Sequence, residues 1–180
     1  MVYQRKSLPV IVTLLLTVAL AGCTAAAVKV PTRAITISAA EAQSAQTAGM
    51  MGLALGNVEW TEGQFSSLLS ELVKQNSGPN TPISAIHAWF EPNNEIYLRV
   101  VLKEGVLKAG NTLDLKGTVA IENHHVVVKL QEAGAGNLSV SGPILTMINR
   151  QIDSALAGAN LGVAATVKTE MGRLMLQIGG

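Results

Sequence analysis

The sequence predicts an α+β fold in which a strongly curved antiparallel sheet of about six strands wraps around one or two helices with apolar faces. Two observations lead to this prediction. The apolar residues recur with a period near 3.6 in some segments, which indicates helices, and with a period of 2 in others, which indicates half-buried strands. Short turns join the period-2 segments, as expected for antiparallel neighbours with one solvated face.

The first 22 residues have the composition of a secretory signal peptide. Arg5 and Lys6 precede an apolar run from Leu8 to Leu20, which is shorter than the roughly 20 residues of a membrane span. Leu20-Ala21-Gly22-Cys23 then has the pattern of a bacterial lipobox, and it contains the only cysteine. We therefore expect residues 1–22 to be removed, Cys23 to be acylated as the first mature residue, and residues 23–37 to form a tether.

A single domain is expected over residues 38–180, beginning with a helix. Ser38-Ala39-Ala40-Glu41 has the spacing of a capping box and predicts a helix toward Leu55. Gly49, Gly52 and Gly56 fall on one face of this helix, where another backbone could approach closely.

A second capping box, Thr61-Glu62-Gly63-Gln64, predicts the next helix. Its apolar residues recur at the spacing of one helix face, and they are Phe65, Leu68, Leu69, Leu72 and Val73. Asn76-Ser77-Gly78-Pro79 ends the helix. Trp60, directly before the box, is placed for a hydrophobic staple against Phe65 or a neighbour.

Six strands and one more helix follow. Alternating apolar residues predict strands over residues 83–90, 96–103, 112–121 and 126–130, with turns at 91–94 and at Asn123-His124. Pro143 then begins a helix with an apolar stripe made of Leu145, Ile148, Ile152, Ala155 and Leu156. A last hairpin is predicted from residues 163–167 and 174–178.

Charge and composition exclude several classes of partner. The chain has 13 basic and 12 acidic residues, and loss of Arg5 and Lys6 with the signal peptide leaves a formal charge of −1. Nucleic-acid binding needs a basic patch, so we expect none. Because no Lys/Arg cluster could hold anionic lipid, we expect membrane attachment through acyl chains on Cys23.

No motif indicates an enzyme, a cofactor or a metal site. The sequence has neither a Gly-x-Ser-x-Gly elbow nor a Walker or dinucleotide glycine pattern. His124 and His125 fall at a turn, where neighbouring side chains point to opposite faces, a poor geometry for one metal ion. His87 is interpreted as a surface or rim residue. Met50 and Met51 are interpreted either as contacts with a lipid or partner or as filler.

Three stretches resemble a known family: Val58 to Leu69 at a helix opening, the Leu113 to Leu130 hairpin, and Leu138 to Leu145 leading into a helix. On them the chain, from Val58 to Ile178, resembles small bacterial lipid-binding lipoproteins of the TULIP (BPI-like) type. In that family a long helix lies in a curved antiparallel sheet, and the gap between them can hold acyl chains.

The resemblance implies an apolar cleft between helix and sheet. Its candidate lipid-binding residues are the inward-facing aliphatic ones, namely Ile96, Leu98, Val100, Leu115, Val119, Val128, Leu145, Ile148 and Ile152. By residue type alone the pattern favours an ordinary core, in which these side chains pack on each other. The resemblance and the expected lipid anchor make the two interpretations about equal.

Three functions follow as hypotheses. The first is an envelope lipoprotein that binds or shuttles a lipid or other amphiphile. We expect it in the outer membrane if the cell has two membranes, because Thr24 is not the aspartate of an inner-membrane retention signal. Otherwise we expect it on the outer face of the cytoplasmic membrane.

The second hypothesis is a non-enzymatic interaction module that docks another envelope protein through an exposed sheet edge or the Gly49/Gly52/Gly56 face. The third, a hydrolase, would need a histidine beside a hydroxyl or carboxylate. An open cavity favours the first hypothesis, and a filled core with an exposed apolar patch favours the second.

Overall fold

The computed structural model describes residues 27–77, 81–106, 110–135, 138–139, 143–157 and 164–179. The signal peptide, Cys23 and Val163 lie outside the described residues. The helices are α2 (Ala39–Leu55), α3 (Glu62–Ser77) and α4 (Pro143–Ala157). The strands are β1 (Asn57–Thr61), β2 (Ile83–Glu91), β3 (Glu95–Leu102), β4 (Thr112–Glu122), β5 (His125–Ala135), β6 (Leu138–Ser139), β7 (Ala165–Glu170) and β8 (Arg173–Ile178).

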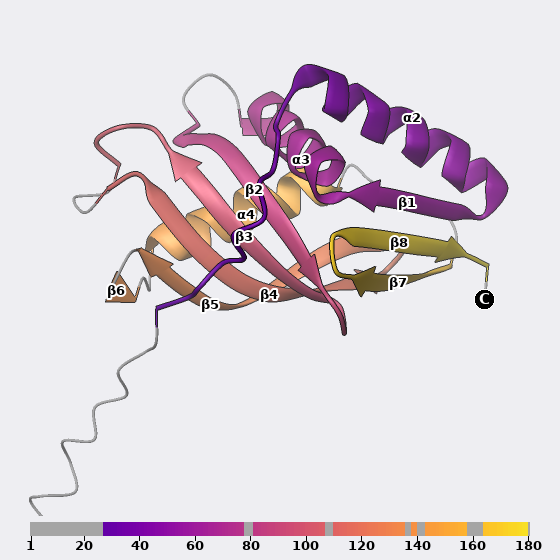
Figure 1. Ribbon diagram of the computed structural model, residues 1–180. Coiled ribbons are helices and arrows are strands. Elements are labelled where there is room, and N and C mark those ends of the chain that lie inside the picture. The colour runs from indigo at the N-terminus through magenta and orange to yellow at the C-terminus, as the bar shows by residue number, and fades with distance from the viewer. Residues whose placement is uncertain are drawn as a thin grey trace, which may run out of the picture.

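The α+β class is confirmed, but the prediction of a single sheet of about six strands is wrong. The structure has two antiparallel sheets, one in the order β2-β3-β4-β5-β6 and one in the order β1-β8-β7 (Figure 1). The smaller sheet contains a strand, β1, which the sequence pattern does not predict. It pairs with the C-terminal strand β8, so that Val58 lies opposite Leu176 and Trp60 opposite Leu174. The last hairpin, β7 and β8, therefore belongs to the sheet of β1 and does not extend the five-stranded sheet.

Two tight turns set the register of the five-stranded sheet. Asn93 and Asn94 in the β2–β3 turn have φ of 66° and 63°, and Asn123 and His124 between β4 and β5 have φ of 50° and 66°. Asparagine tolerates this left-handed conformation better than most residues. With φ positive at both central residues, the Asn123-His124 turn has the geometry that matches the twist of a two-residue hairpin. The turn predicted at these two residues is confirmed.

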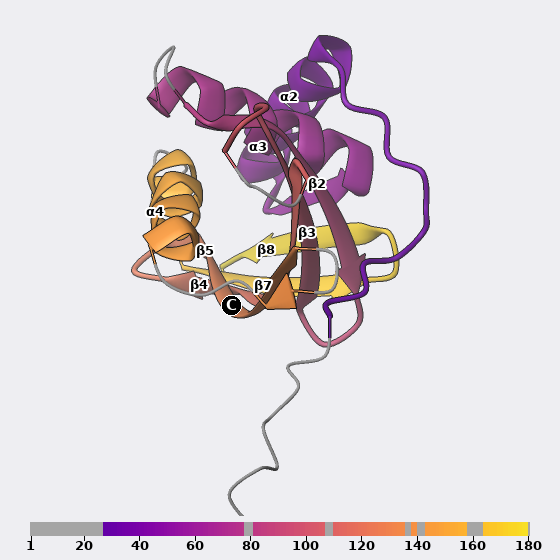
Figure 2. The ribbon, with the colours of Figure 1, turned by 90° about the vertical axis from the view of Figure 1, so that its left-hand side faces the viewer.

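The helices α3 and α4 lie against the five-stranded sheet, α3 beside β2 and α4 beside β5 (Figure 2). On β3 and β4, the side chains that face these helices alternate with outward-facing ones. The resulting core joins both helices to both sheets, and its aromatic centre is Phe65, with ring centroids 5.2 Å from Phe90 and 6.1 Å from Trp60. Trp60 thus contacts Phe65, as the predicted staple requires.

The helix α2 crosses β1 and α3 through small residues. A Cβ atom placed on Gly52 would overlap the carbonyl oxygen of Asn57 and lie 2.8 Å from the Cα of Val58. The predicted close approach of another backbone is therefore confirmed at Gly52, and the neighbour is β1 of the same chain. Gly56 is not on that helix face, because it caps the helix with φ of 81°. The glycine face is consequently covered and cannot be the docking surface considered above.

Candidate functional site

The nine predicted lipid-binding residues come together, but most of them pack on each other. Eight are at most 3% exposed, and Leu145 alone is half-buried. All nine belong to, or pack against, one apolar cluster. The cavity found within this cluster has a volume of about 20 Å³, which is near the minimum for one water molecule. In this conformation the predicted cleft is a filled core.

A much larger hollow lies between α4 and β5. It has a volume of about 510 Å³, and its lining residues are Glu122, Val127, Val128, Lys129, Leu130, Leu145, Thr146, Asn149 and Asp153. A second hollow of about 260 Å³ shares Glu122, Val127 and Asp153 with it and extends to His125 and Ala157. We call the two together the α4–β5 groove. Val128 and Leu145 are the only members of the predicted lipid-binding set among its lining residues.

One wall of the groove is the outer edge of β5. On its inner side β5 pairs with β4, from Glu122 opposite His125 through Gly117 opposite Leu130. On its outer side it pairs with β6 only at Gly134 and Ala135. The two-residue turn makes Glu122 and His125 a hydrogen-bonded pair, and such pairs alternate along the ladder. The main-chain groups of Val126, Val128 and Leu130 therefore point away from β4. Within the part of the chain that the structure describes, no hydrogen bond reaches them.

The opposite edge of the same sheet, β2, is closed. The N–H groups of Ile86 and Ala88 donate to Ser70 Oγ at 2.9 Å and Ser66 Oγ at 2.8 Å, and the N–H of Phe90 donates to Glu62 Oε1 at 2.9 Å. Side chains of α3 thus occupy the outward groups of this strand. On α4, which lies beside the edge of β5, the hydrogen bond of Asn149 and Asp153 joins these two side chains to each other and not to β5.

The second wall of the groove is a polar row on α4. Thr146, Asn149 and Asp153 lie at i, i+3 and i+7, which places them on one helix face. Asn149 Nδ2 donates to Asp153 Oδ2 at 3.1 Å, whereas Asn149 Oδ1 and His125 Nδ1 are buried atoms with no partner among the described residues. Partial burial raises the pKa of Asp153, because it penalises the carboxylate form.

The charges of the groove do not cancel. Lys129 pairs with Glu122 across the β4–β5 ladder. Asp153 has no ion-pair partner among the described residues, so the lining carries a formal charge of −1. Sequence reasoning missed this polar row, although Asn149 and Asp153 stand out as polar residues opposite the apolar stripe of α4. The open edge had no sequence signal of its own.

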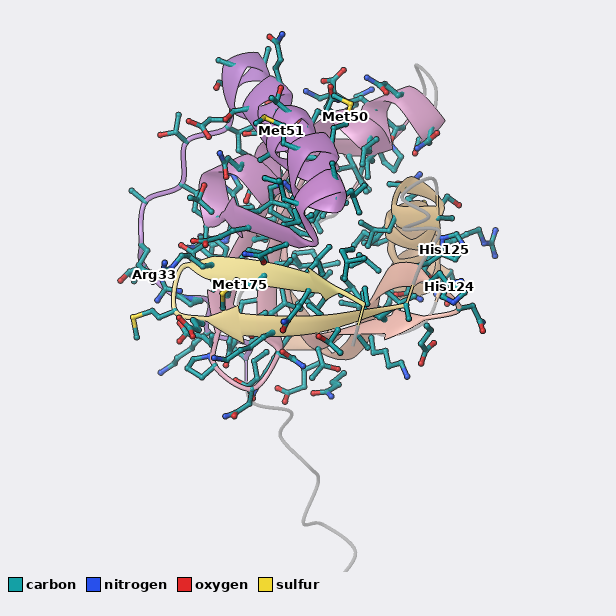
Figure 3. All side chains as sticks on the ribbon, turned by 90° about the vertical axis from the view of Figure 1, so that its right-hand side faces the viewer. Arg33, Met50, Met51, His124, His125 and Met175 are labelled. Carbon is teal, nitrogen blue, oxygen red and sulfur yellow. The ribbon has the colours of Figure 1, made fainter. Side chains whose placement is uncertain are left out.

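A separate charged cluster fixes the N-terminal segment on the other side of the molecule. The Arg33 guanidinium contacts Glu62 Oε1 at 2.7 Å and Glu91 Oε1 at 2.8 Å, and both carboxylates raise its pKa. The indole N–H of Trp89 donates to the carbonyl oxygen of Arg33 at 2.9 Å. Figure 3 shows Arg33 on one side of the structure and His124 and His125 on the other, beside α4. The cluster is therefore an anchor for the segment and lies away from the groove.

The remaining candidate residues are scattered. His87 stacks on Trp89 with 6.1 Å between ring centroids, and burial, with Arg99 nearby, lowers its pKa. Among the residues that the structure describes, no group of three or more His, Cys, Asp or Glu side chains could hold a metal ion. In that same part of the chain, no helix is both long and apolar enough to span a membrane. Met50 and Met51 are 68% and 60% exposed on α2, next to Leu53 and Leu55.

Comparison with known proteins gives no neighbour for this arrangement: no family model, no curated protein and no solved structure matches the chain.

Proposed function

We propose that the chain is an envelope-anchored binding module that docks a partner in the α4–β5 groove and carries out no covalent chemistry. The observation that supports this most strongly is the difference between the two edges of one sheet. The edge of β2 is occupied by Glu62, Ser66 and Ser70, while the edge of β5 faces a hollow of about 510 Å³. An unpaired strand edge is a template for association, and folded proteins normally cover or blunt it.

Two further features support a docking role. Eight of the nine residues predicted to line a lipid cleft are buried in the core, and α2 presents an exposed apolar patch made of Met50, Met51, Leu53 and Leu55. Patches of this kind often mark interaction sites. We further propose that acyl chains on Cys23 hold the module at the membrane, in the outer membrane of a two-membrane cell and otherwise on the outer face of the cytoplasmic membrane.

Site-directed photo-crosslinking in intact cells tests the docking function. A photoreactive residue at Thr146, in the groove, is compared with one at Gln177, which is exposed on β8 in the other sheet. We expect a discrete adduct from Thr146 only, and we expect Val127→Trp to abolish it by filling the groove. Equal adducts from both positions, or none from Thr146, would contradict the proposal.

A lipid-binding function is a second candidate, and it requires the small apolar cavity of about 20 Å³ in the core to open. The side chains that line it are wholly apolar, and they come from β1, α3, β5 and α4. We propose for this case that α3 and α4 separate to admit an acyl chain, with the strongly curved sheet of the sequence prediction wrapped around their apolar faces. Burial of the chain would then supply about 25 cal/mol per Å² of apolar surface.

Native mass spectrometry of the chain after gentle extraction tests this second function. The expected result is a stoichiometric lipid adduct that Leu72→Trp, at the cavity, displaces and that Leu53→Trp, on the exposed face of α2, leaves in place. A lipid-free mass with no uptake from added phospholipid would exclude it.

A further inference from the structure

We infer that the partner of the α4–β5 groove is an extended polypeptide segment that adds a strand to β5 and places a basic side chain beside Asp153. This inference rests on the proposed docking function and specifies its ligand.

The first argument concerns what the edge of β5 offers. Val126 and Val128 direct their side chains into the core, where each is 3% exposed, so at the edge they present mainly main-chain groups. A row of N–H and C=O groups at alternate residues is complementary to the backbone of another extended chain. Lipid tails have no donors or acceptors with which to satisfy it.

The second argument concerns length. The pairing of β6 with Gly134 and Ala135 closes one end of the open edge, and the Asn123-His124 turn closes the other. Between them the outward groups of Val126, Val128 and Leu130 span five residues. At about 3.4 Å per residue this accommodates a strand of five or six residues, about 17–20 Å long.

The third argument concerns the wall formed by α4. Asn149 Oδ1 is a buried acceptor without a donor among the described residues, and a backbone or side-chain N–H of an inserted strand would supply one. Thr146 and Asp153 are separated along the helix by about 10 Å, which corresponds to three residues of a strand. The helix can therefore contact successive side chains on one face of the ligand.

The fourth argument concerns side-chain preference. The part of the groove near the start of α4 is lined by Leu130 and Leu145, and the part near its end by Asp153 and His125. Because Lys129 neutralises Glu122, Asp153 leaves a net negative charge in the lining. A matching segment has an apolar residue at the Leu130/Leu145 end and a lysine or arginine at the Asp153 end.

The segment comes from another molecule and not from the chain's own tether. The described part of the tether lies on the β2 side of the sheet. There Arg33 forms ion pairs with Glu62 and Glu91, and the indole N–H of Trp89 donates to the carbonyl oxygen of Arg33. Strands β2 and β5 lie on opposite sides of β3 and β4 in the sheet order.

The test is selection of displayed random heptapeptides on the full mature chain in nanodiscs. The selected peptide is then remade with N-methyl groups at alternate residues, in the two possible registers. We expect one register to weaken binding roughly tenfold or more, since each methyl removes a main-chain donor, and the other register to change it little. Replacing the basic residue of the peptide by norleucine should weaken binding to the wild type about fivefold, and to the Asp153→Asn variant hardly at all.

Two kinds of result overturn the inference. Selected peptides that lose equal affinity in both registers do not bind as a strand. If no peptide is enriched while the Thr146 crosslink carries a lipid or a second copy of this chain, the groove is a docking site with a different occupant, and the proposed function survives. If the crosslink is absent as well, both the inference and the proposed function are wrong.

Val128→Pro is a second probe, because it removes an outward N–H of β5 and leaves the hydrogen bonds between β4 and β5 intact. It should abolish peptide binding while circular dichroism remains unchanged.

Discussion

Ser70 on α3 makes two hydrogen bonds with the main chain of Ile86 on β2. Its Oγ accepts from the N–H at 2.9 Å and donates to the carbonyl oxygen at 3.2 Å. Ser66 stands in the same relation to Ala88, one helical turn earlier. Four residues of a helix rise about 6 Å, and two residues of a strand rise about 6.8 Å. Because these distances are similar, helix side chains at i and i+4 can bond to every second residue along a strand edge for several contacts. The helix takes the place of a sixth strand in the five-stranded sheet.

Ser70→Ala tests this closure. It leaves the buried N–H and C=O of Ile86 without the Ser70 hydroxyl as a partner, which lowers the free energy of unfolding by about 1–3 kcal/mol. The higher helix propensity of alanine raises it by about 0.5 kcal/mol. We therefore expect a net loss of about 1–2 kcal/mol in the free energy of urea unfolding. Ser44→Ala is the control, because its exposed hydroxyl accepts one hydrogen bond among the described residues, from Gln64. It gains the same propensity and should leave stability within 0.5 kcal/mol of the wild type. Similar effects of the two substitutions would refute the role of Ser70.

The helices and most of the strands could be predicted from the sequence, because local rules determine them. The Thr61 and Gln64 capping box is present with both hydrogen bonds, at 3.0 and 3.2 Å, and the Asn123-His124 turn has the conformation that two-residue hairpins require. At the Ser38 box only half of the pattern forms. Glu41 N–H donates to Ser38 Oγ, but the N–H of Ser38 donates to Ser67 Oγ on α3 and not to Glu41.

The division into two sheets and the position of the groove could not be predicted, because both depend on contacts between distant residues. Val58 and Trp60 alternate over only five residues, and their strand partner lies more than a hundred residues later in β8. The buried row of Glu62, Ser66 and Ser70 did carry a signal, since three polar residues recur at i, i+4 and i+8. That pattern usually indicates a solvated helix face. Here the three side chains bond to the edge of β2 instead, which only the position of β2 in the fold determines.

Arg33→Ala should release the N-terminal segment. Its removal leaves the Glu62 carboxylate, whose side chain is 10% exposed, without a counter-charge, and loss of one partner from such a pair costs about 2–4 kcal/mol. Arg33→Lys should recover only part of this, because an ammonium cannot bridge Glu62, Glu91 and the carbonyl oxygen of Phe90 as the guanidinium does. Urea unfolding measures the loss, and limited proteolysis near residues 27–37 measures release of the segment. An unchanged cleavage rate in Arg33→Ala would show that the segment is held by other contacts.

Gly52→Ala should destabilise the packing of α2 on β1. The added methyl group would meet the backbone at Asn57 and Val58, which cannot move aside without shifting the strand. We expect a loss of about 1–3 kcal/mol, as in other overpacked sites. Gly63→Ala is the matched control, because its methyl would meet its nearest atom, the carbonyl oxygen of Thr36, at 3.4 Å in ordinary contact. This substitution should raise stability by about 0.4–1 kcal/mol. Thermal unfolding of both variants decides between a steric effect and a general effect of glycine.

His87 should make stability depend on pH below neutrality. Burial, helped by Arg99, lowers the pKa of His87 in the folded chain below its ordinary value of 6.5. In the range from 6.5 down to that lowered pKa, the unfolded chain binds more protons than the folded one, so stability falls as the pH falls. The ring is partly exposed on the sheet face beside Trp89 and Arg99, so we expect a few tenths of a kcal/mol. Unfolding of His87→Gln between pH 7 and 5 should show a shallower decline than the wild type. Parallel curves would mean that the histidine titrates alike in both states.

Asp153→Asn should separate stability from binding. Because burial raises the pKa of Asp153, the folded chain holds this proton more tightly than the unfolded chain, and stability falls as the pH rises through that range. At neutral pH the full penalty is present, and asparagine removes it while keeping an acceptor for Asn149 Nδ2. We expect the variant to be more stable than the wild type at pH 7, by less than about 1 kcal/mol, and equally stable near pH 3. The same variant should bind basic peptides less tightly. If the variant loses both stability and binding, Asp153 is a structural residue of α4. If it gains stability and loses binding, the Asp153 carboxylate destabilises the fold and contributes to binding of the partner.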